Sequence, residues 1–450
     1  MSLADIIVFP LYALLFALIF SIRLKRIEDP VLKKYKRQGF LIKIVSTIAF
    51  IIFSVFITRG DSMFLYYPEG INIARLIVKD FSNIQLLFSS GKDFDQNLLA
   101  DSFNRGYFNS ESNYLVARMV AVLSFITLGS YSAITLIFSM ISFAGVWRLY
   151  KFFYELYPHL HKQFAVAIIY LPTFVFWSSG ILKDPLCTGM MGFLTFSVYN
   201  VLIKRKSIFK NSNVAIGSAS ILGTVKMYIL IAYLPFLLLF VILYHVKKAE
   251  AVFTKILLLA STVIITGIAF YLFSDKIKEK MGDYALDKIA VSVKTTQSNF
   301  ENISSQAESS FSLGTYFDGS AISLLKIAPA AIVATLFRPF LWESKKLSTL
   351  LSSIESLLLI LFTLYVLIKV GLVTIVSAII SDPMILFCLL FALLFALFVG
   401  ATTLNFGTLV RYKVPCMPFY IISLVLLLQR KKCAQLKAAT LLTLLNNLPN

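Results

Sequence analysis

Residues 23–61 read RLKRIEDPVLKKYKRQGFLIKIVSTIAFIIFSVFITRGD, and this stretch decides the fold. Its first part, from Arg23 to Lys43, carries eight Lys and Arg residues against two acids. Loops this rich in basic residues stay on the cytoplasmic side of a membrane. The apolar part, about Leu41–Thr58, approaches the length that crosses a bilayer. It therefore runs outward and brings Asp61 to the opposite face.

The whole chain has the composition of a protein that crosses a membrane many times. It has 450 residues, of which 58% are hydrophobic and 14% are charged, and its mean hydropathy is +0.82. A soluble protein carries about 25% charged residues. The net charge of +19 resides mainly in short basic loops beside apolar runs, so it indicates cytoplasmic anchoring and no nucleic-acid partner. The four cysteines show no paired spacing, and we expect neither disulfides nor a zinc site.

We expect an all-α polytopic membrane helical bundle with about 11 transmembrane helices. With an outside N-terminus, this number of spans places every basic cluster on the cytoplasmic side, together with the C-terminus. The protein is then integral to a membrane, which we expect to be the bacterial inner (cytoplasmic) membrane. The expected spans are Ile6–Ile22, Leu41–Thr58, Ser132–Trp147, Phe164–Gly180, Leu186–Ile203, Val214–Val225, Tyr228–Tyr244, Lys255–Phe273, Leu347–Lys369, Met384–Gly400 and Tyr412–Leu428.

Two polar stretches form extracytoplasmic loops that carry interfacial helices. The first follows Asp61, with an interfacial helix over Gly70–Phe88 and a short apolar segment at Leu115–Leu128. The second begins at Ser274, with a helix over Asp275–Val293 and a possible lid in Lys294–Ser312. The apolar segment Ile322–Phe337 is expected to be re-entrant or interfacial. The chain then divides into residues 1–40, 41–273 with the outer loop 59–114, 274–346, 347–429 and 430–450.

Several charged residues lie at or near the ends of apolar segments, and the expected topology places all of them at the non-cytoplasmic face. They are Asp61, Lys183, Asp184, Lys226, Arg338 and Arg411. A set of opposite charges at one membrane face predicts a binding site for an anionic, lipid-linked substrate. Structural roles explain each residue separately: an Asp caps a helix, a Lys snorkels, and an Arg beside aromatic residues anchors a span.

The chemistry of these side chains suits transfer of a group from a phosphate-bearing lipid. A carboxylate such as Asp61 accepts a proton from a hydroxyl group or binds a divalent metal ion. The guanidinium groups of Arg338 and Arg411 match the geometry of a phosphate. The sequence indicates no definite cofactor and leaves only a divalent cation open, for which Asp61 would be the ligand.

Three short motifs resemble those of the GT-C glycosyltransferases, which include protein O-mannosyltransferases and the aminoarabinose transferase of lipid A. The motifs are Asp61…Tyr66…Ala74, then Pro172…Trp177-Ser178…Lys183-Asp184, and Arg411-Tyr412…Pro415…Pro418. The resemblance covers roughly residues 40–245 and 400–420. It implies inverting sugar transfer at the extracytoplasmic face from a polyprenyl-phosphate-linked sugar, with membrane lipid as a further partner.

The resemblance also implies roles for individual residues. Asp61 would be the acceptor-side base or a metal-site acid, and Asp184 with Lys183 would belong to the donor site. Many members carry a second acid next to the first, whereas Ser62 stands here and Glu69 is the nearest later acid. We therefore assign catalysis to Asp61 and Asp184, and substrate binding to Glu69, Lys183, Lys226, Arg338, Arg411 and Tyr412.

Other classes of membrane protein fit parts of the same pattern. A polysaccharide polymerase or ligase of the O-antigen type would also use outward-facing arginines such as Arg338 and Arg411. A transporter or lipid flippase would carry charges in the middle of its spans and broken helices in related halves. A purely structural membrane protein is the remaining alternative.

Overall fold

The computed structural model describes residues 3–58, 60–90, 105–248, 321–344 and 347–446, with residues 294, 298, 311 and 313 as isolated positions. Within these ranges every regular secondary-structure element is a helix, and there is no β-strand. Seven described helices are long and apolar enough to cross a membrane, or eight if one bent pair forms a single span. The prediction of an all-α polytopic membrane protein is confirmed. The expected span Lys255–Phe273 and the expected helix Asp275–Val293 lie outside the described residues.

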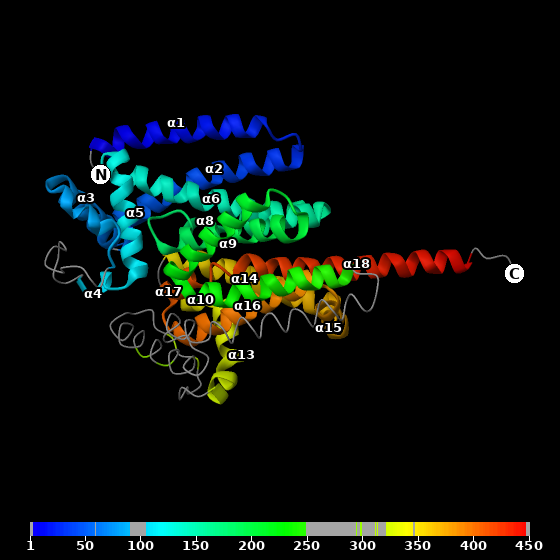
Figure 1. Ribbon diagram of the computed structural model, residues 1–450. Helices are drawn as coiled ribbons and strands as arrows, with labels where there is room; N and C mark the ends of the chain where they lie inside the picture. Colours follow the sequence, from blue (N-terminus) through cyan, green and yellow to red (C-terminus); the bar gives the residue numbers. More distant parts are fainter. Residues whose placement is uncertain are drawn as a thin grey trace, which may run out of the picture. The chain divides into compact units, whose positions relative to one another are not determined.

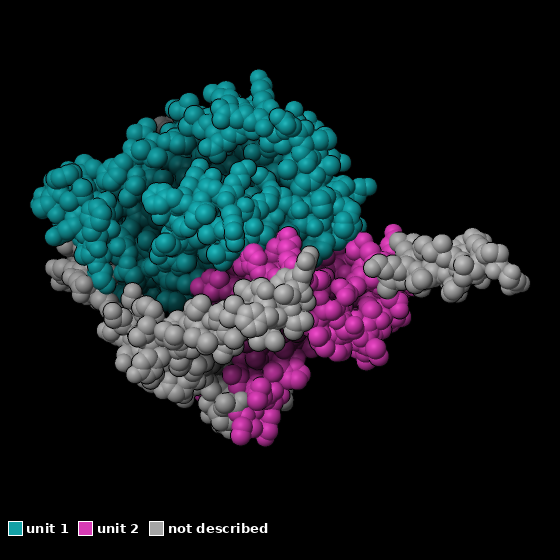
Figure 2. Space-filling model, turned by 45° about the vertical axis from the view of Figure 1, so that its right-hand side comes forward, with its two compact units in different colours: residues 1–230 teal, residues 231–450 magenta. Residues whose placement is uncertain are grey.

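The chain forms two compact units, residues 1–230 and 231–450 (Figure 2). In unit 1 the long helices lie side by side (Figure 1). They are α1 (Leu3–Lys25), α2 (Pro30–Ile52), α6 (Tyr131–Leu156) and α9 (Lys183–Val198). The first part of α10 (Ile208–Lys248) also belongs to unit 1.

Glycines bring the backbones of α6 and α9 into contact at the centre of unit 1. A Cβ atom added at Gly145 would lie 1.9 Å from Gly189 O, and one added at Gly192 would lie 2.0 Å from Gly145 O. Small residues permit this close approach between membrane helices, where packing and not the hydrophobic effect drives association.

Shorter helices cover one end of unit 1. They are α3 (Tyr67–Lys79), α4 (Arg105–Phe108) and α5 (Glu111–Thr127), and Figure 1 shows them where α1, α2 and α6 begin or end. A 3₁₀ turn, Phe81–Leu87, follows α3, so the segment expected to be an interfacial helix is helical. The π-helical turns Phe53–Ile57 and Ser62–Tyr66, which flank Asp61 in the sequence, also lie at this end.

The expected cytoplasmic loop from Arg23 to Lys43 is mostly helix, which corrects its length. Helix α2 begins at Pro30, and the Asp29 side chain caps it by accepting hydrogen bonds from the amides of Val31 and Leu32. The number of basic residues suggested a loop, but an Asp cap followed by Pro in the first turn is a strong signal for the start of a helix. Lys43 therefore lies in the middle of the span Pro30–Ile57 and not in a loop.

The expected single span Phe164–Gly180 is wrong. The structure has two short helices there, α7 (His161–Ile168) and α8 (Pro172–Trp177). Leu171 is extended because a residue before proline avoids the helical conformation. The expected break between Val225 and Tyr228 is present as a kink in α10, where Lys226 has non-helical angles (φ −150°, ψ 81°).

Unit 2 is also helical. Its later elements are α13 (Ala321–Phe337), α14 (Leu347–Val370), α15 (Leu372–Ser381), α16 (Pro383–Thr402), α17 (Phe406–Tyr412) and α18 (Met417–Asn446). Helix α13 is too short to be counted as a span and packs on α16, where a Cβ atom at Gly400 would lie 2.0 Å from Ala331 O. Helices α17 and α18 meet at a bend of 62°. Helix α15 was not expected from the sequence.

Candidate functional site

Two buried opposite charges form the centre of the candidate site in unit 1. Lys226 Nζ donates to Asp184 Oδ1 at 2.6 Å, and the two side chains are only 6% and 1% exposed. Asp184 lies in the first turn of α9, whose N-cap is Leu182, so Asp184 is not the helix cap that its position before Pro185 suggested. The ion pair is its principal described contact.

The kink in α10 places Lys226 opposite this carboxylate. Lys226 has extended backbone angles between two helical segments. A buried charge costs several kcal/mol of desolvation unless an opposite charge compensates it. The kink at Lys226 therefore places the ammonium group next to Asp184, and the ion pair joins α9 to α10.

Lys183 and Asp61 lie beside this pair. Lys183 Nζ donates to Ser112 Oγ at 2.7 Å, and its charge is close enough to interact with those of Lys226, Asp184 and Asp61. Lys183 and Asp61 are both half-buried. The structure thus brings together the four charged residues that the sequence singled out in this part of the chain. We call them the unit 1 charge cluster.

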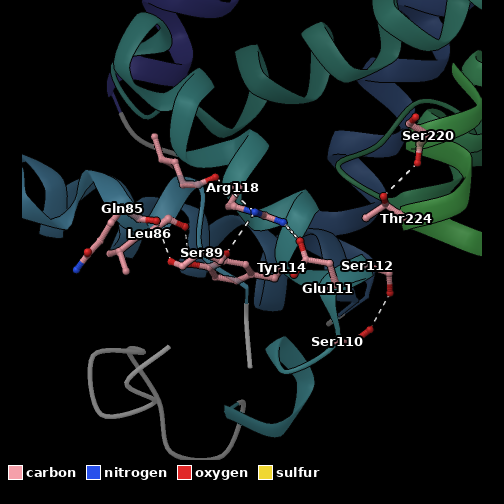
Figure 3. A network of polar contacts seen from close by, with 11 residues as sticks. Gln85, Leu86, Ser89, Ser110, Glu111, Ser112, Tyr114, Arg118, Ser220 and Thr224 are labelled. Carbon is pink, nitrogen blue, oxygen red and sulfur yellow. Dashed lines mark hydrogen bonds and ion pairs between the residues drawn. The ribbon is translucent and has the colours of Figure 1, made fainter. Parts of the chain in front are cut away.

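A polar network in the helices at this end holds Ser112 in place (Figure 3). Arg118 pairs with Glu111 and donates to the carbonyl oxygens of Leu87 and Ser89, each at 3.4 Å. Ser112 shares a hydrogen bond of 2.8 Å with Ser110. The network fixes α5 against the turn that follows α3, and so positions the hydroxyl that Lys183 contacts.

Glu69 lies in α3, which packs on α5. Its side chain is buried, and burial together with the nearby Glu69 raises the pKa of Tyr114 above its ordinary value. Tyr114 Oη donates to Leu86 O at 2.8 Å. The role of Glu69 in substrate binding stays a prediction.

The donor set near Asp61 gives no sign of a metal site within the described ranges. No group of three or more His, Cys, Asp or Glu residues there is arranged to bind a metal ion. Ser62 Oγ, next to Asp61, shares a hydrogen bond of 2.9 Å with Tyr131 Oη. The divalent cation stays a prediction.

Unit 2 has its own charged group. Arg338 Nε donates to both carboxylate oxygens of Glu343, at 3.0 and 3.1 Å, and its guanidinium lies 4.4 and 5.1 Å from the ring centroids of Phe311 and Phe406. Phe406 begins α17, whose last residues Arg411 and Tyr412 are half-buried. Arg338 is thus already engaged by a carboxylate and two aromatic rings.

Lys413 is a site residue that the sequence analysis passed over. It is fully buried, and its Nζ donates to Arg338 O and to Ser356 Oγ, both at 3.0 Å. Its position two residues after Arg411, at the start of the last apolar segment, was the signal. The six charges first expected at one face thus form two groups, each defined within its own unit.

A second missed residue is Lys43, in the middle of α2. Its Nζ donates to Ser178 Oγ and Ser178 O, each at 2.6 Å, and to Val175 O at 3.4 Å. These oxygens lie at the C-terminal end of α8, where the helix dipole favours a cation. The same lysine lines a small pocket with Phe143 and Trp147.

Comparisons with known proteins leave the class open: no family model, no curated protein and no solved structure matches the chain. The fold and the site therefore define a polytopic α-helical membrane protein with a buried ion pair at one end of unit 1, and function must be argued from that site.

Proposed function

We propose that the chain is an integral membrane glycosyltransferase of the GT-C type. It would move a sugar from a polyprenyl-phosphate donor to a lipid, glycan or protein acceptor at the extracytoplasmic face. The observation that carries this proposal is the unit 1 charge cluster, in which Asp61 and Lys183 flank the buried pair of Asp184 and Lys226. Charges buried among apolar helices are costly and mark functional sites.

The cluster supplies the groups that sugar transfer requires. The acceptor hydroxyl attacks the anomeric carbon, and the bond from that carbon to the phosphate oxygen breaks with its electron pair moving to the phosphate. Asp61, half-buried, takes the hydroxyl proton. Lys183 neutralises the departing phosphate, while Asp184 holds Lys226 in place. For Arg411 and Tyr412, which lie in unit 2, substrate binding stays a prediction from the sequence.

The distribution of basic residues supports the sidedness of the proposal. Lys204, paired with Glu155 at the far end of α6, lies at the opposite end of unit 1 from Asp61. In unit 2, Arg430 donates to Ser381 Oγ and lies 3.7 Å from Asp382, and Lys247 contacts Ser381 O. Basic ends are cytoplasmic, so the C-terminus would be cytoplasmic and the cluster outside. A bacterial inner membrane fits this arrangement.

Transfer of labelled sugar tests the proposal. Membranes that contain the chain are mixed with a panel of polyprenyl-phosphate hexoses carrying radiolabelled sugar, and label in lipid, glycan and protein is counted. Asp61→Asn should lower the rate by about 10²–10⁴-fold at an unchanged midpoint of thermal unfolding. Glu28→Gln, exposed in the short loop between α1 and α2, is the matched control. Full activity in Asp61→Asn would refute the assigned base.

A polymerase or ligase of the O-antigen type is the second candidate. It is favoured by the cations gathered in unit 2, where Lys413 and Arg338 are in contact and Arg411 lies two residues away from Lys413. Such an enzyme would use undecaprenyl-diphosphate sugars. Loss of polymer on Arg411→Ala, with Asp61→Asn silent, would favour it.

A transporter or flippase is favoured by a different observation. Lys43, in the middle of the span Pro30–Ile57, binds carbonyl groups at the C-terminal end of the short helix α8, and such helix ends bind cations in transporters. Movement of a lipid-linked sugar across the membrane without covalent change would support this class.

A further inference from the structure

A cluster of four cations lies near the end of unit 1 that holds the short loop between α1 and α2. Lys36 in α2 lies within electrostatic reach of Arg23 in α1 and of Arg148 and Lys151 in α6. Arg148 also lies within reach of Arg23. We call these four residues the basic cluster.

The basic cluster is set among aromatic rings. Lys36 Nζ lies 5.9 Å from the ring centroids of both Phe20 and Trp147. The guanidinium of Arg148 lies 4.3 Å from the ring of Phe193. Lys36 and Arg148 are both half-buried, so water screens their mutual repulsion less than at an open surface.

Carboxylates do not compensate this charge. Within the described ranges Glu155 alone pairs with a member of the cluster, Lys151 at 3.5 Å, and it also pairs with Lys204 at 2.6 Å. Three half-buried or buried cations elsewhere have acids: Lys226 has Asp184, Arg338 has Glu343 and Arg430 has Asp382. The buried Lys43 and Lys413 instead donate to carbonyl and hydroxyl oxygens. Like charges that share one acid among them favour the binding of an anion from outside the chain.

We propose that the basic cluster binds the phosphate headgroup of an anionic phospholipid. The cluster lies about half a turn to just over two helical turns inside the ends of α1, α2 and α6, near the level at which headgroups meet hydrocarbon. Basic pockets between membrane helices on the cytoplasmic side bind such headgroups. On α1, the exposed apolar side chains of Leu18 and Ile22 lead up to Arg23 and offer a surface for an acyl chain. This site does not depend on the proposed transferase function.

Lipid titration of the full-length protein in detergent tests the proposal. The midpoint of thermal unfolding is followed during addition of phosphatidylglycerol, phosphatidylcholine or inorganic phosphate. Phosphatidylglycerol should raise the midpoint in a saturable way, and phosphatidylcholine should not. Lys36→Gln with Arg148→Gln should weaken the apparent affinity about ten- to thirty-fold, because each Lys or Arg near an anionic headgroup increases the affinity about five-fold.

Lys33→Gln with Arg37→Gln is the matched control, because it removes the same charge from exposed positions of α2. It should change the affinity by less than about two-fold. Equal weakening in both double variants would show diffuse surface charge and overturn the site. An equal shift with inorganic phosphate would show that a soluble anion, and not a lipid, is bound. If the Lys36 and Arg148 variant fails to fold, native mass spectrometry of the wild type decides: a retained phosphatidylglycerol supports the proposal, and retention of both lipids alike refutes it.

Discussion

Lys226 Nζ lies 2.6 Å from Asp184 Oδ1, and this contact ties the kink of α10 to the first turn of α9. The two residues are 42 positions apart, and both side chains are almost completely buried. A charge in such a place is stable only with its partner. The pair therefore sets the local geometry around Lys183 and Asp61.

Removal of one partner should damage the protein more than removal of both. Asp184→Asn leaves Lys226 as an uncompensated buried charge and should lower the free energy of unfolding by about 3–5 kcal/mol. Asp184→Asn combined with Lys226→Met should recover much of that loss, because no buried charge remains. Denaturant titration of the two single variants and the double variant measures the coupling. Additive losses would show that the ion pair does not stabilise this region.

The glycine contact between α6 and α9 gives a second test of stability. Gly192→Ala places a methyl group about 2.0 Å from Gly145 O, so the helices must separate, and we expect a loss of at least about 2 kcal/mol. Gly217→Ala in α10 is the matched control, because a Cβ atom there meets nothing within 4 Å. That variant should be neutral or slightly stabilising, since alanine favours helix. The midpoints of thermal unfolding of both variants, compared with that of the wild type, test this expectation.

The sequence predicted the parts of this structure that follow from local composition. Apolar length indicated the long helices, and the charge at Lys226 marked the kink within a continuous apolar run. The grouping of Asp61 with Lys183 and Asp184 followed from topology, because spans of alternating direction return to the same face. These features can be predicted from residues close together in the sequence or from the alternating direction of successive spans.

What the sequence missed depends on contacts between distant residues. Lys43 was counted with a basic loop, because nothing near it in the chain shows that Ser178 supplies its acceptors. Phe164–Gly180 is apolar enough to be read as a span, but the extended residues before Pro172 divide it. The choice of Asp184 as the partner of Lys226 depends on a contact between residues 42 positions apart, which no periodicity reveals.

Lys43 separates two of the candidate functions. For a transferase with its centre at Asp61, Lys43→Met should leave the transfer rate of folded protein within about two-fold, because Lys43 lies in the middle of the span Pro30–Ile57 and Asp61 follows the end of that span. For a transporter that uses the broken helix α8, the same change should abolish substrate movement. Transfer and flux assays on one membrane preparation compare the two. Lost transfer activity with normal folding would extend the catalytic site to the middle of the membrane.

The helix cap at Asp29 predicts a dependence of stability on pH. Partial burial raises the pKa of Asp29, but hydrogen bonds from Tyr154 Oη and from the amides of Leu32 and Val31 outweigh it and hold the pKa below its ordinary value of 3.8. The lowered pKa means that the charged form stabilises the fold. This contribution is complete above the ordinary pKa and is lost as the pH falls through the folded-state value.

Comparison of wild type with Asp29→Asn isolates that contribution, because asparagine also caps a helix but does not titrate. The difference in unfolding midpoint should be constant from about pH 7 to about pH 5 and should shrink as the pH falls below the ordinary pKa. Glu28→Gln, at an exposed neighbouring position, should show no such trend. A difference that grows in acid would contradict the assigned direction.

Membrane sidedness can be measured separately for each unit. In a variant without the four native cysteines, single cysteines at Ser110 and Trp342 should react in intact cells with a thiol reagent that does not cross membranes, because both positions are exposed and lie at the ends that carry the candidate charges. Cysteines at Lys206 and Ser381, exposed at the basic ends, should react only after permeabilisation. If Ser110 and Trp342 label from opposite sides, Arg411 cannot serve a site at Asp61, and the transferase would have to act with the charges of unit 1 alone.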